Sequence, residues 1–560
     1  MDSNFNETTV YSEGKAGLIV GLSEVLGIPA VFDELLTSES GRPPEVPYGI
    51  LAMMMMVNMC DDHKPLYLLN EYYEFKDLEG IFHYPVRLDQ INDDRFGGML
   101  DRFYEAGCRK IFSNIAAKAF LHYDIKIRNI NFDTTSKVMW GLYETDEEPK
   151  GIIKINFGHS KDKREDKKQI KIGIGCAEGI VADAVVLSGN KDDKTYNADN
   201  LDNLDEILQR FAVSRDDFYY IADSALFSED NMKKATSKGI NLITRMPDNV
   251  KIASESIAEV VENPALLSTL KFNNAQEKER KYGIYEKVET YRDSKLKLAI
   301  CYSYGLEDTK LKTVTKNANK EFERLTALAS SIAKRDFACS EDADKEIHKL
   351  YGKDFKKLSY HSVKLSIHKE AKRRPGRPSI IISDSMTEYK HFLEVEIVRE
   401  QTQIDRAVFS ACCFVLCSND LAITASSLLM EYKTQDSVEK KFQQLKSPHF
   451  VNSIYLDSPQ RVEAFAYLML ISILTLSIGE YVVRRGMKKN DETIIGPGKI
   501  KMKSPTINAI YSVFYSVRIR LVKNSGKARR ELAQPLRNNI LTILKHLKIP
   551  HDTFTRGMGS

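Results

Sequence analysis

The stretch Tyr432-Lys-Thr-Gln435-Asp-Ser-Val-Glu439, which runs on to Lys446, places four chemically different side chains at helical spacing. Counted from the tyrosine, the amide follows at three positions, the carboxylate at seven and the lysine ammonium at fourteen. At about 100° per helical residue, the four fall within roughly 60° of one another. We therefore predict one helix from Tyr432 to Lys446 that presents all four side chains to the same neighbour.

Two ordinary interpretations compete with a functional one for this stretch. A lone carboxylate beside a lysine on a helix is usually only a solvated ion pair. In addition, Thr434, Asp436 and Ser437 are of the type that caps helices, so they could end the helix before Glu439. A functional role is favoured by two further acids elsewhere in the chain.

The bulk composition predicts a soluble protein of several domains. A chain of 560 residues is too long for a single hydrophobic core. With 42% hydrophobic and 28% charged residues, it has the composition of a globular rather than a disordered protein. The net charge of +3 does not indicate a polyanionic partner, so local basic segments must carry that argument.

The cysteines and the apolar runs indicate a reducing cytoplasm and no membrane span. The eight cysteines lack the paired spacing of a disulfide framework, and the Cys-rich run Val408–Cys417 is interpreted as a buried strand rather than a metal site. The apolar run from Ala464 to Ile478 is shorter than the ~20 residues that cross a bilayer, so a core helix is expected. The polar N-terminus has no signal-peptide core.

Two acids close predicted strands. The residues from 1 to about 125 have helical periodicity, after which the period changes to two. Ile127–Asp133 and Phe218–Asp223 are predicted strands that each end in an acid, and Ser228 can cap the helix that follows the second. Open α/β sheets bind ligands at the carboxyl ends of their strands, although either acid alone would usually be a turn or cap residue.

A hairpin is predicted between these two acids. Apolar residues from Ile170 to Cys176 alternate with Lys171 and two glycines, which predicts a strand with one buried face. Glu178-Gly179 marks a turn, and Val181–Leu187 is the returning strand.

The rest of the chain is divided by changes of composition. The expected regions are a helical domain (1–125), the first part of an α/β domain (126–250), an insertion of charged, mixed character (251–390), the second part of the α/β domain (391–482) and a helical basic C-terminal region (483–560). Within the insertion, Arg-Pro-Gly-Arg-Pro cannot be helical. Its Arg374 and Arg377 could enter a DNA minor groove, and a solvated basic linker is the alternative.

The three acids suggest one shared site. Asp133 and Asp223 end strands of one sheet, and Glu439 follows on a later helix. Carboxylates that meet at one point repel one another, and a divalent cation is the usual compensation. Mg²⁺ prefers oxygen ligands and is completed by water and phosphate oxygens. Two such ions about 3.5–4 Å apart would support phosphoryl transfer, with Lys446 near the phosphate and Tyr432 against the strand.

These motifs together make the chain resemble the DDE transposases of bacterial insertion sequences, in the IS-four superfamily. The third-acid region of that family reads Tyr, two residues, Arg, three residues, Glu, six residues, Lys; every spacing is kept here, with Gln435 in place of the arginine. Further similar segments are Asn131–Thr135, Gly158–Asp162, Lys168-Gln169, Gly189–Asp193, Ile221–Leu226 and Leu88–Asp101. The resemblance covers roughly residues 15 to 480.

The resemblance implies a ribonuclease-H-like fold, in which a mixed sheet is flanked by helices. It implies that Asp133, Asp223 and Glu439 are catalytic and hold two Mg²⁺ ions, for which Mn²⁺ can substitute. It also implies contacts to DNA, for which the candidates are Tyr432, Gln435, Lys446, Arg374, Arg377, His159 and Lys161. The glutamine at 435 weakens one phosphate contact and leaves the metal site unchanged.

The implied activity is cut-and-paste transposition in the bacterial cytoplasm, on nucleoid DNA. The enzyme would bind terminal inverted repeats, with its helical N-terminal domain as a DNA-binding module, cut both strands and join the 3′ ends to target DNA. Pairing of two ends implies a homodimer, which can be monomeric before DNA binds. The 216 positions between Asp223 and Glu439 leave room for a β-containing insertion that helps to clamp the transposon end.

Two alternatives remain open. A nuclease of the same fold would cut DNA without joining it to a target. A regulator derived from a transposase would bind DNA without cutting it, although the presence of all three acids argues against this.

Overall fold

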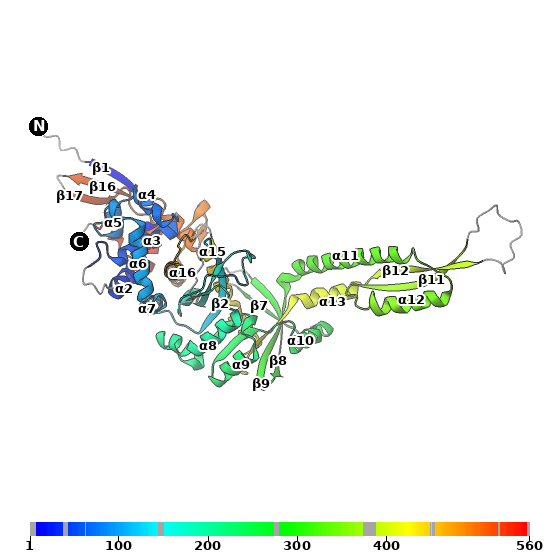
Figure 1. Ribbon diagram of the computed structural model, residues 1–560. Coiled ribbons are helices and arrows are strands. Elements are labelled where there is room, and N and C mark those ends of the chain that lie inside the picture. Colours follow the sequence, from blue (N-terminus) through cyan, green and yellow to red (C-terminus); the bar gives the residue numbers. More distant parts are fainter. Residues whose placement is uncertain are drawn as a thin grey trace.

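The computed structural model describes residues 7–36, 43–61, 63–143, 151–273, 279–372, 388–447, 450, 454–524 and 527–556. Figure 1 shows three parts in succession: a lobe built from both ends of the chain, a central sheet, and a long arm that projects from the sheet. The architecture is a mixed α/β fold with a large mixed sheet and many helices.

The N-terminal lobe is helical, as its periodicity predicts. Its helices are α1 (Ala16–Val25), α2 (Ile28–Leu35), α3 (Tyr48–Asp61), α4 (Leu69–Tyr73), α5 (Leu78–Phe82), α6 (Asp93–Glu105) and α7 (Cys108–His122). The methionines of α3 are buried and fill the core of the lobe. Asn92 caps α6 by accepting a hydrogen bond from the backbone N–H of Arg95 (3.0 Å).

The C-terminal region, expected to be helical, contains a β-hairpin that pairs with the N-terminus. β16 (Arg518–Asn524) lies antiparallel between β1 (Glu7–Ser12) and β17 (Lys527–Leu532). The expectation of a helix is wrong for these residues. The buried Ile519 lies between the exposed Arg518 and Arg520, which is the period of two of a strand, whereas the prediction rests on the basic composition of the region. The other elements of this region are β14 (Ile494–Ile495), β15 (Lys501–Met502), α17 (Ile507–Phe514) and α18 (Asn538–Leu547).

A nine-stranded mixed sheet forms the centre of the described part of the chain, in the order β4-β3-β2-β5-β6-β13-β9-β8-β7. Its strands are β2 (Asn129–Val138), β3 (Gln169–Ala177), β4 (Ile180–Ser188), β5 (Tyr219–Ala222), β6 (Asn241–Arg245), β7 (Ser268–Asn273), β8 (Glu279–Tyr291), β9 (Ser294–Ser303) and β13 (Cys413–Ser418). β5 is parallel to both β2 and β6, and the other neighbouring pairs are antiparallel.

Helices cover both faces of the sheet around β2. On one face Tyr220 stacks on Phe132 and donates a hydrogen bond to Asn197 of α8 (Asp193–Arg210). Asn131 points to the opposite face, where its amide donates to the Thr434 hydroxyl (2.8 Å) between α14 (Ala425–Lys433) and α15 (Asp436–Lys446). Because side chains alternate along a strand, Asp133 shares the face of Asn131, which α14 and α15 cover.

Several local predictions are confirmed, and one is wrong in part. The hairpin β3–β4 turns at Glu178-Gly179, and Ser228 caps α9 (Glu229–Ser237). However, β3 is buried along its whole length, whereas one buried face was predicted. The helix α8, which covers this face of the strand, explains the difference. A Cβ at Gly173 would lie 2.4 Å from the ring of Tyr196 in α8, so the absence of a side chain at this glycine allows the helix to pack closely on the strand.

The arm is inserted between β9 and β13 and has its own small core. Its elements are α11 (Glu307–Ile332), β10 (Asp336–Phe337), α12 (Ser340–Lys353), β11 (His361–Ala371), β12 (Tyr389–Arg399) and α13 (Gln401–Cys412). Strands β10, β12 and β11 form a separate sheet, against which apolar residues of α11 and α12 pack. Arg374 and Arg377 fall between β11 and β12 in the sequence and lie outside the described residues.

The arm differs from the expected insertion at both of its boundaries. Strands β7, β8 and β9, expected within the insertion, belong to the central sheet, while β12 and α13 belong to the arm. The Cys-rich run is likewise only half strand, because Val408–Cys412 ends α13 and β13 begins at Cys413. Strand partners are chosen by long-range packing, which local periodicity does not report.

The predicted core helix is α16 (Pro459–Asn490), which begins at the Ser458 cap and runs through the protein. It is long and apolar enough to cross a membrane by length and composition, but 94% of its most apolar window is buried inside the protein. It packs against α6, α7 and β4, so it joins the N-terminal lobe to the edge of the sheet. The helix α10 (Lys251–Glu262) packs against β13 and α13 at the base of the arm.

Candidate active site

The first two acids lie on adjacent parallel strands. The parallel register of β2 and β5 runs from Asn129↔Tyr219 to Phe132↔Ala222, so Asp133 and Asp223 are the next pair. Asp223 follows the end of its strand, as predicted, and its side chain accepts a hydrogen bond from the backbone N–H of Ala225 (3.0 Å). Asp133 does not end its strand, because β2 continues to Val138 beside β3. Adjacent strands lie about 4.8 Å apart, so the two carboxylates are neighbours.

The environment of these acids disfavours their negative charge. Burial raises the pKa of Asp133 to about 6; the Lys161 ammonium opposes this rise and Asp223 adds to it. Burial also raises the pKa of Asp223, again opposed by Lys161. Two neighbouring carboxylates with raised pKa values form a site where an additional cation would be bound favourably.

A lysine already lies against Asp133. The Lys161 ammonium donates to Asp133 Oδ1 (3.0 Å) and to the Thr134 carbonyl oxygen (2.6 Å), and it lies 3.3 Å from Asp193 Oδ2. Asp193, the first residue of α8, also accepts from the Thr134 hydroxyl (2.5 Å) and from the ammonium of the buried Lys171 (3.1 Å). Lys161 therefore joins the first acid to a fourth carboxylate that the three-acid pattern does not include.

The stretch from Tyr432 to Lys446 forms two helices rather than one. Around Gln435 the backbone bonds span three residues, from Gln435 N–H to Tyr432 O (3.1 Å) and from Val438 N–H to Gln435 O (3.0 Å). The Thr434 hydroxyl donates to the carbonyl oxygen of Glu431 (2.6 Å). A threonine hydroxyl competes in this way with the regular helix, which is why α14 ends before α15 begins.

Tyr432 lies within the electrostatic reach of all three predicted acids. Burial raises the pKa of its hydroxyl, the Arg245 guanidinium lowers it, and Asp223, Asp133 and Glu439 raise it further. Glu439 itself is exposed in the first turn of α15. The structure therefore brings Glu439, like the two aspartates, near enough to Tyr432 to raise the pKa of its hydroxyl.

A divalent cation fits part of this arrangement. Asp133 and Asp223 supply adjacent carboxylate oxygens, which Mg²⁺ and Mn²⁺ prefer, and their charge is incompletely compensated. Within the residues that the structure describes, however, no three His, Cys, Asp or Glu side chains are gathered closely enough to hold a metal ion. Glu439 would have to approach the two aspartates to complete a three-carboxylate site.

Comparison with known proteins assigns the family. A family model described as a transposase DDE domain matches residues 143–475, more than half of the 560-residue chain. This chain belongs to the DDE transposase family. The match begins ten residues after Asp133 and contains Asp223 and Glu439. A second model, a domain of unknown function (DUF4277), matches residues 9–117 of this transposase, which form the helical lobe.

Comparisons with curated proteins and with solved structures do not extend this family assignment. No curated protein matches the chain. Among solved structures, the cryo-EM structure of a piggyBac transposase synaptic complex with hairpin DNA is similar, with 12% sequence identity over 90% of this chain and 80% of that chain. The TM-score is 0.35, and a likeness this weak carries no argument about this transposase.

The remaining candidates for DNA contact lie around the acids in different settings. Lys446 is ion-paired with Asp162 (2.5 Å), next to the buried Lys137, whose pKa burial lowers to about 8. Gln435 is buried at the junction of α14 and α15, and His159 is exposed in the loop before β3. Lys446 is partly exposed and His159 is exposed, whereas Gln435 is enclosed.

Sequence reasoning misses three groups of this site. Asp193 belongs to the family-like run Gly189–Asp193, but as one of two successive aspartates it resembles an ordinary helix start. Lys171 alternates with isoleucines and so resembles a solvent-facing residue of a half-buried strand. Arg245 is the last residue of β6, which pairs with β5. It lowers the pKa of Tyr432 from there, and the sequence does not show this proximity because it depends on the order of the strands in the sheet.

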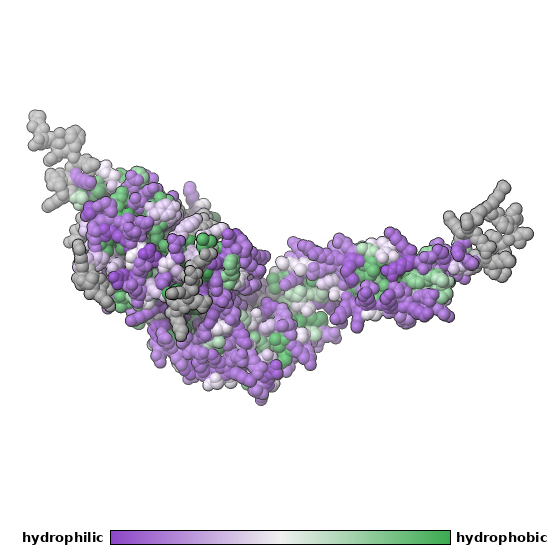
Figure 2. Space-filling model, in the orientation of Figure 1, coloured by the Kyte–Doolittle hydropathy of each residue, from purple (hydrophilic) through white to green (hydrophobic). Residues whose placement is uncertain are grey.

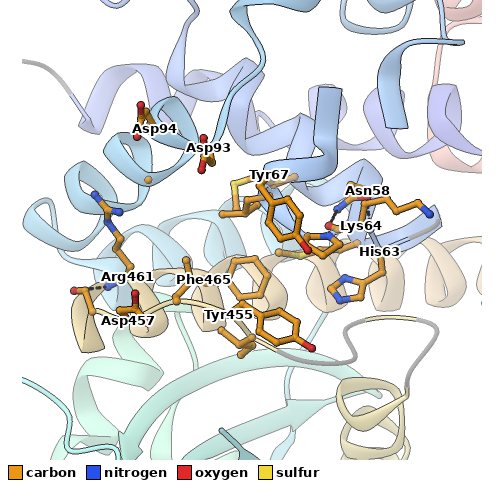
Figure 3. Close-up of a pocket in the computed structure, with 18 residues that line it drawn as sticks. Asn58, His63, Lys64, Tyr67, Asp93, Asp94, Tyr455, Asp457, Arg461 and Phe465 are labelled. Carbon is orange, nitrogen blue, oxygen red and sulfur yellow. Dashed lines mark hydrogen bonds between the residues drawn. The ribbon is translucent and has the colours of Figure 1, made fainter. Parts of the chain in front are cut away.

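A separate hollow of about 360 Å³ lies between the N-terminal lobe and α16 (Figure 3). Its wall includes the rings of Tyr67, Tyr455 and Phe465, with Asp93 and Asp94 at the start of α6. None of the three predicted acids lines it. The hollow is therefore distinct from the carboxylate site.

Proposed function

We propose that this DDE transposase serves a bacterial insertion sequence of the IS-four superfamily. It would bind terminal inverted repeats, cleave the DNA and join the freed 3′ ends to target DNA. The observation that carries the proposal is the adjacency of Asp133 and Asp223 on parallel strands, in a chain that matches a transposase DDE domain over residues 143–475. The Tyr432, Glu439 and Lys446 spacing supports the superfamily assignment, and the mixed sheet supports a ribonuclease-H-like core.

The proposed reaction uses Asp133, Asp223 and Glu439 as holders of two Mg²⁺ ions, or of Mn²⁺ in their place. When bound, such ions lower the pKa of an attacking water or 3′-hydroxyl and neutralise charge on the leaving oxygen. Lys446 would release Asp162 and pair with a phosphate, a charge-assisted contact of the kind that dominates affinity for DNA. Tyr432 would pack against the strand beside the acids.

The proposed partners follow from this activity. The DNA would be the duplex of the terminal inverted repeats and the target duplex, bound in the bacterial cytoplasm on nucleoid DNA. Two ends must be held together, which requires a homodimer in the synaptic complex, and assembly on DNA permits a monomer beforehand. The N-terminal lobe and the basic segment with Arg374 and Arg377 are the proposed accessory DNA contacts.

The test uses the protein with Mg²⁺ and a duplex whose end is the inverted repeat read from the DNA flanking the coding region. We expect nicks at the repeat boundary and, with a supercoiled target plasmid, joined product. A matched Asp133→Asn protein should give neither. Cleavage without joining would instead support a nuclease, and binding without cleavage in either Mg²⁺ or Mn²⁺ would support a regulator.

A further inference from the structure

The Lys161 ammonium makes two hydrogen bonds and one further ion pair at the site. The ammonium donates to Asp133 Oδ1 (3.0 Å) and to the Thr134 carbonyl oxygen (2.6 Å), and it lies 3.3 Å from Asp193 Oδ2 as an ion pair. Only 28% of the side chain is exposed. The ammonium therefore takes the position of a counter-ion for the first acid.

The loop that carries Lys161 is fixed to the sheet. Its backbone N–H donates to the Ser136 hydroxyl of β2 (3.0 Å), and Gln169 donates to the carbonyl oxygens of His159 (3.2 Å) and Gly189 (2.8 Å). A Cβ at Gly158 would lie 2.2 Å from the Gly189 carbonyl oxygen, so the loop lies directly on the segment that leads to α8. Because the backbone is held, only the flexible side chain of Lys161 is free to change partners.

Asp193 is held independently of the first acid. Its carboxylate accepts hydrogen bonds from the Thr134 hydroxyl (2.5 Å) and from the ammonium of the buried Lys171 (3.1 Å). The three aspartates, Asp133, Asp193 and Asp223, carry one more charge than the two lysines that face them. The cluster can therefore accept a further cation while Asp193 keeps its own partners.

We propose that Lys161 is an exchangeable internal counter-ion of this site and that Asp193 is its positioning residue. In the cation-free protein the ammonium is bonded to Asp133. If a divalent cation were held by Asp133, the ammonium would keep its ion pair with Asp193 and its hydrogen bond to the Thr134 carbonyl oxygen, and the N–H that had been donated to Asp133 would be available to a phosphate oxygen of the DNA. The inference rests on the proposed function, since it requires that Asp133 holds a cation.

The direct test is Mn²⁺ binding to the full chain by titration calorimetry, without DNA. Lys161→Met removes the competing ammonium, so we expect Mn²⁺ to bind about tenfold more tightly than to the wild type, the size of one charged hydrogen bond. Lys161→Arg keeps the charge and should stay close to the wild-type affinity. Melting temperatures without Mn²⁺ show whether each variant is folded.

Two results would separate the possible failures. If wild type binds Mn²⁺ no better than Asp133→Asn does, the cation site of the proposed function is wrong. If wild type binds Mn²⁺ through Asp133 but Lys161→Met binds equally or more weakly, the counter-ion inference alone is wrong.

The role of Asp193 is tested by a double-mutant cycle. Alone, Asp193→Asn should weaken Mn²⁺ binding, because Lys161 then turns wholly to Asp133. In the Lys161→Met background the same change should alter the affinity by less than about twofold. A further loss in that background would mean that Asp193 is itself a cation ligand, which would overturn its assignment as a positioning residue.

The release of the ammonium is tested by DNA affinity. The probe is a pre-cut inverted-repeat duplex that ends in a 3′-dideoxynucleotide and so cannot be joined. Lys161→Met should weaken its binding several-fold when Mn²⁺ is present and by less than about twofold when Mn²⁺ is absent. An equal loss under both conditions would contradict the exchange.

Discussion

Two clusters in this transposase each place a cationic side chain among carboxylates, and they differ in access. Arg530 of β17 donates to Asp77 (2.7 Å), to Glu13 (3.0 Å) and to the Gly80 carbonyl oxygen (2.7 Å), with 5%, 9% and 1% of the Arg530, Asp77 and Glu13 side chains exposed. Around Lys161 the corresponding fractions are 28% for the lysine, 18% for Asp133 and 22% for Asp193.

The difference separates a structural ion cluster from a chemical one. The Arg530 cluster joins the C-terminal hairpin to the N-terminal lobe, and its guanidinium is enclosed by fixed partners. The Lys161 cluster lies at the junction of two parallel strands, has an excess of negative charge, and is closed only by a flexible side chain. A cluster that is partly open and unbalanced can exchange its cation, whereas a sealed one can only hold the fold together.

The largest expected effect is on DNA cleavage. Asp133→Asn should lower the cleavage rate by at least roughly a thousandfold, because members of a catalytic unit fail together. Its melting temperature should stay equal to or above that of the wild type, since the change removes a buried charge. Asp77→Asn is the matched control in the sealed cluster: it should lower stability and leave the cleavage rate per folded molecule unchanged. If Asp77→Asn lowered the cleavage rate per folded molecule while Asp133→Asn lowered only the stability, the distinction between the two clusters would be wrong.

The next largest effect is on stability. Arg530→Met leaves Glu13 and Asp77 buried without their cation, which costs about 3–5 kcal/mol of the free energy of unfolding. Lys161→Met, at a partly open position, should cost less than about 1 kcal/mol. Urea denaturation of both variants measures the loss in the free energy of unfolding relative to the wild type. Equal losses would indicate that Lys161 is as structural as Arg530.

A smaller effect is expected in the pH dependence of stability. Burial raises the pKa of Glu13 from 4.5 to about 7, opposed by Arg530 and assisted by Asp77. The folded protein therefore binds this proton more tightly than the unfolded chain, and stability falls as pH rises from about 4.5 through about 7, by up to about 3 kcal/mol. Glu13→Gln should flatten that part of the stability curve. An unchanged slope in the variant would show that another group is responsible.

Local sequence patterns predict one part of this site well and another part poorly. The apolar run that ends at Asp223 and the Ser228 cap follow from neighbouring residues, and both are seen in the structure. The position of Asp133 in mid-strand and the pairing of Lys161 with Asp193 depend on which strands and loops meet, which periodicity does not encode. The helix break was foreseeable as a risk at Thr434, but the hydroxyl that causes it is also bonded to Asn131, a partner more than three hundred residues away.

The same limit explains the arm and the hairpin at the lobe. The alternation in β9 identifies a strand, yet its place in the central sheet depends on β13, which follows the whole arm in the sequence. Strand β16 likewise needs β1 from the other end of the chain. Contacts between segments that are distant in the sequence therefore determine these features of the fold, which local sequence patterns do not predict.

The most direct test is the location of Mn²⁺ in crystals of the transposase bound to its inverted-repeat end, read from anomalous scattering. The account predicts a Mn²⁺ ion ligated by oxygens of both Asp133 and Asp223, with Glu439 completing the site beside the DNA phosphate and the Lys161 ammonium withdrawn from Asp133. Mn²⁺ bound elsewhere, or a DNA complex in which Glu439 remains remote from the two aspartates, would contradict it.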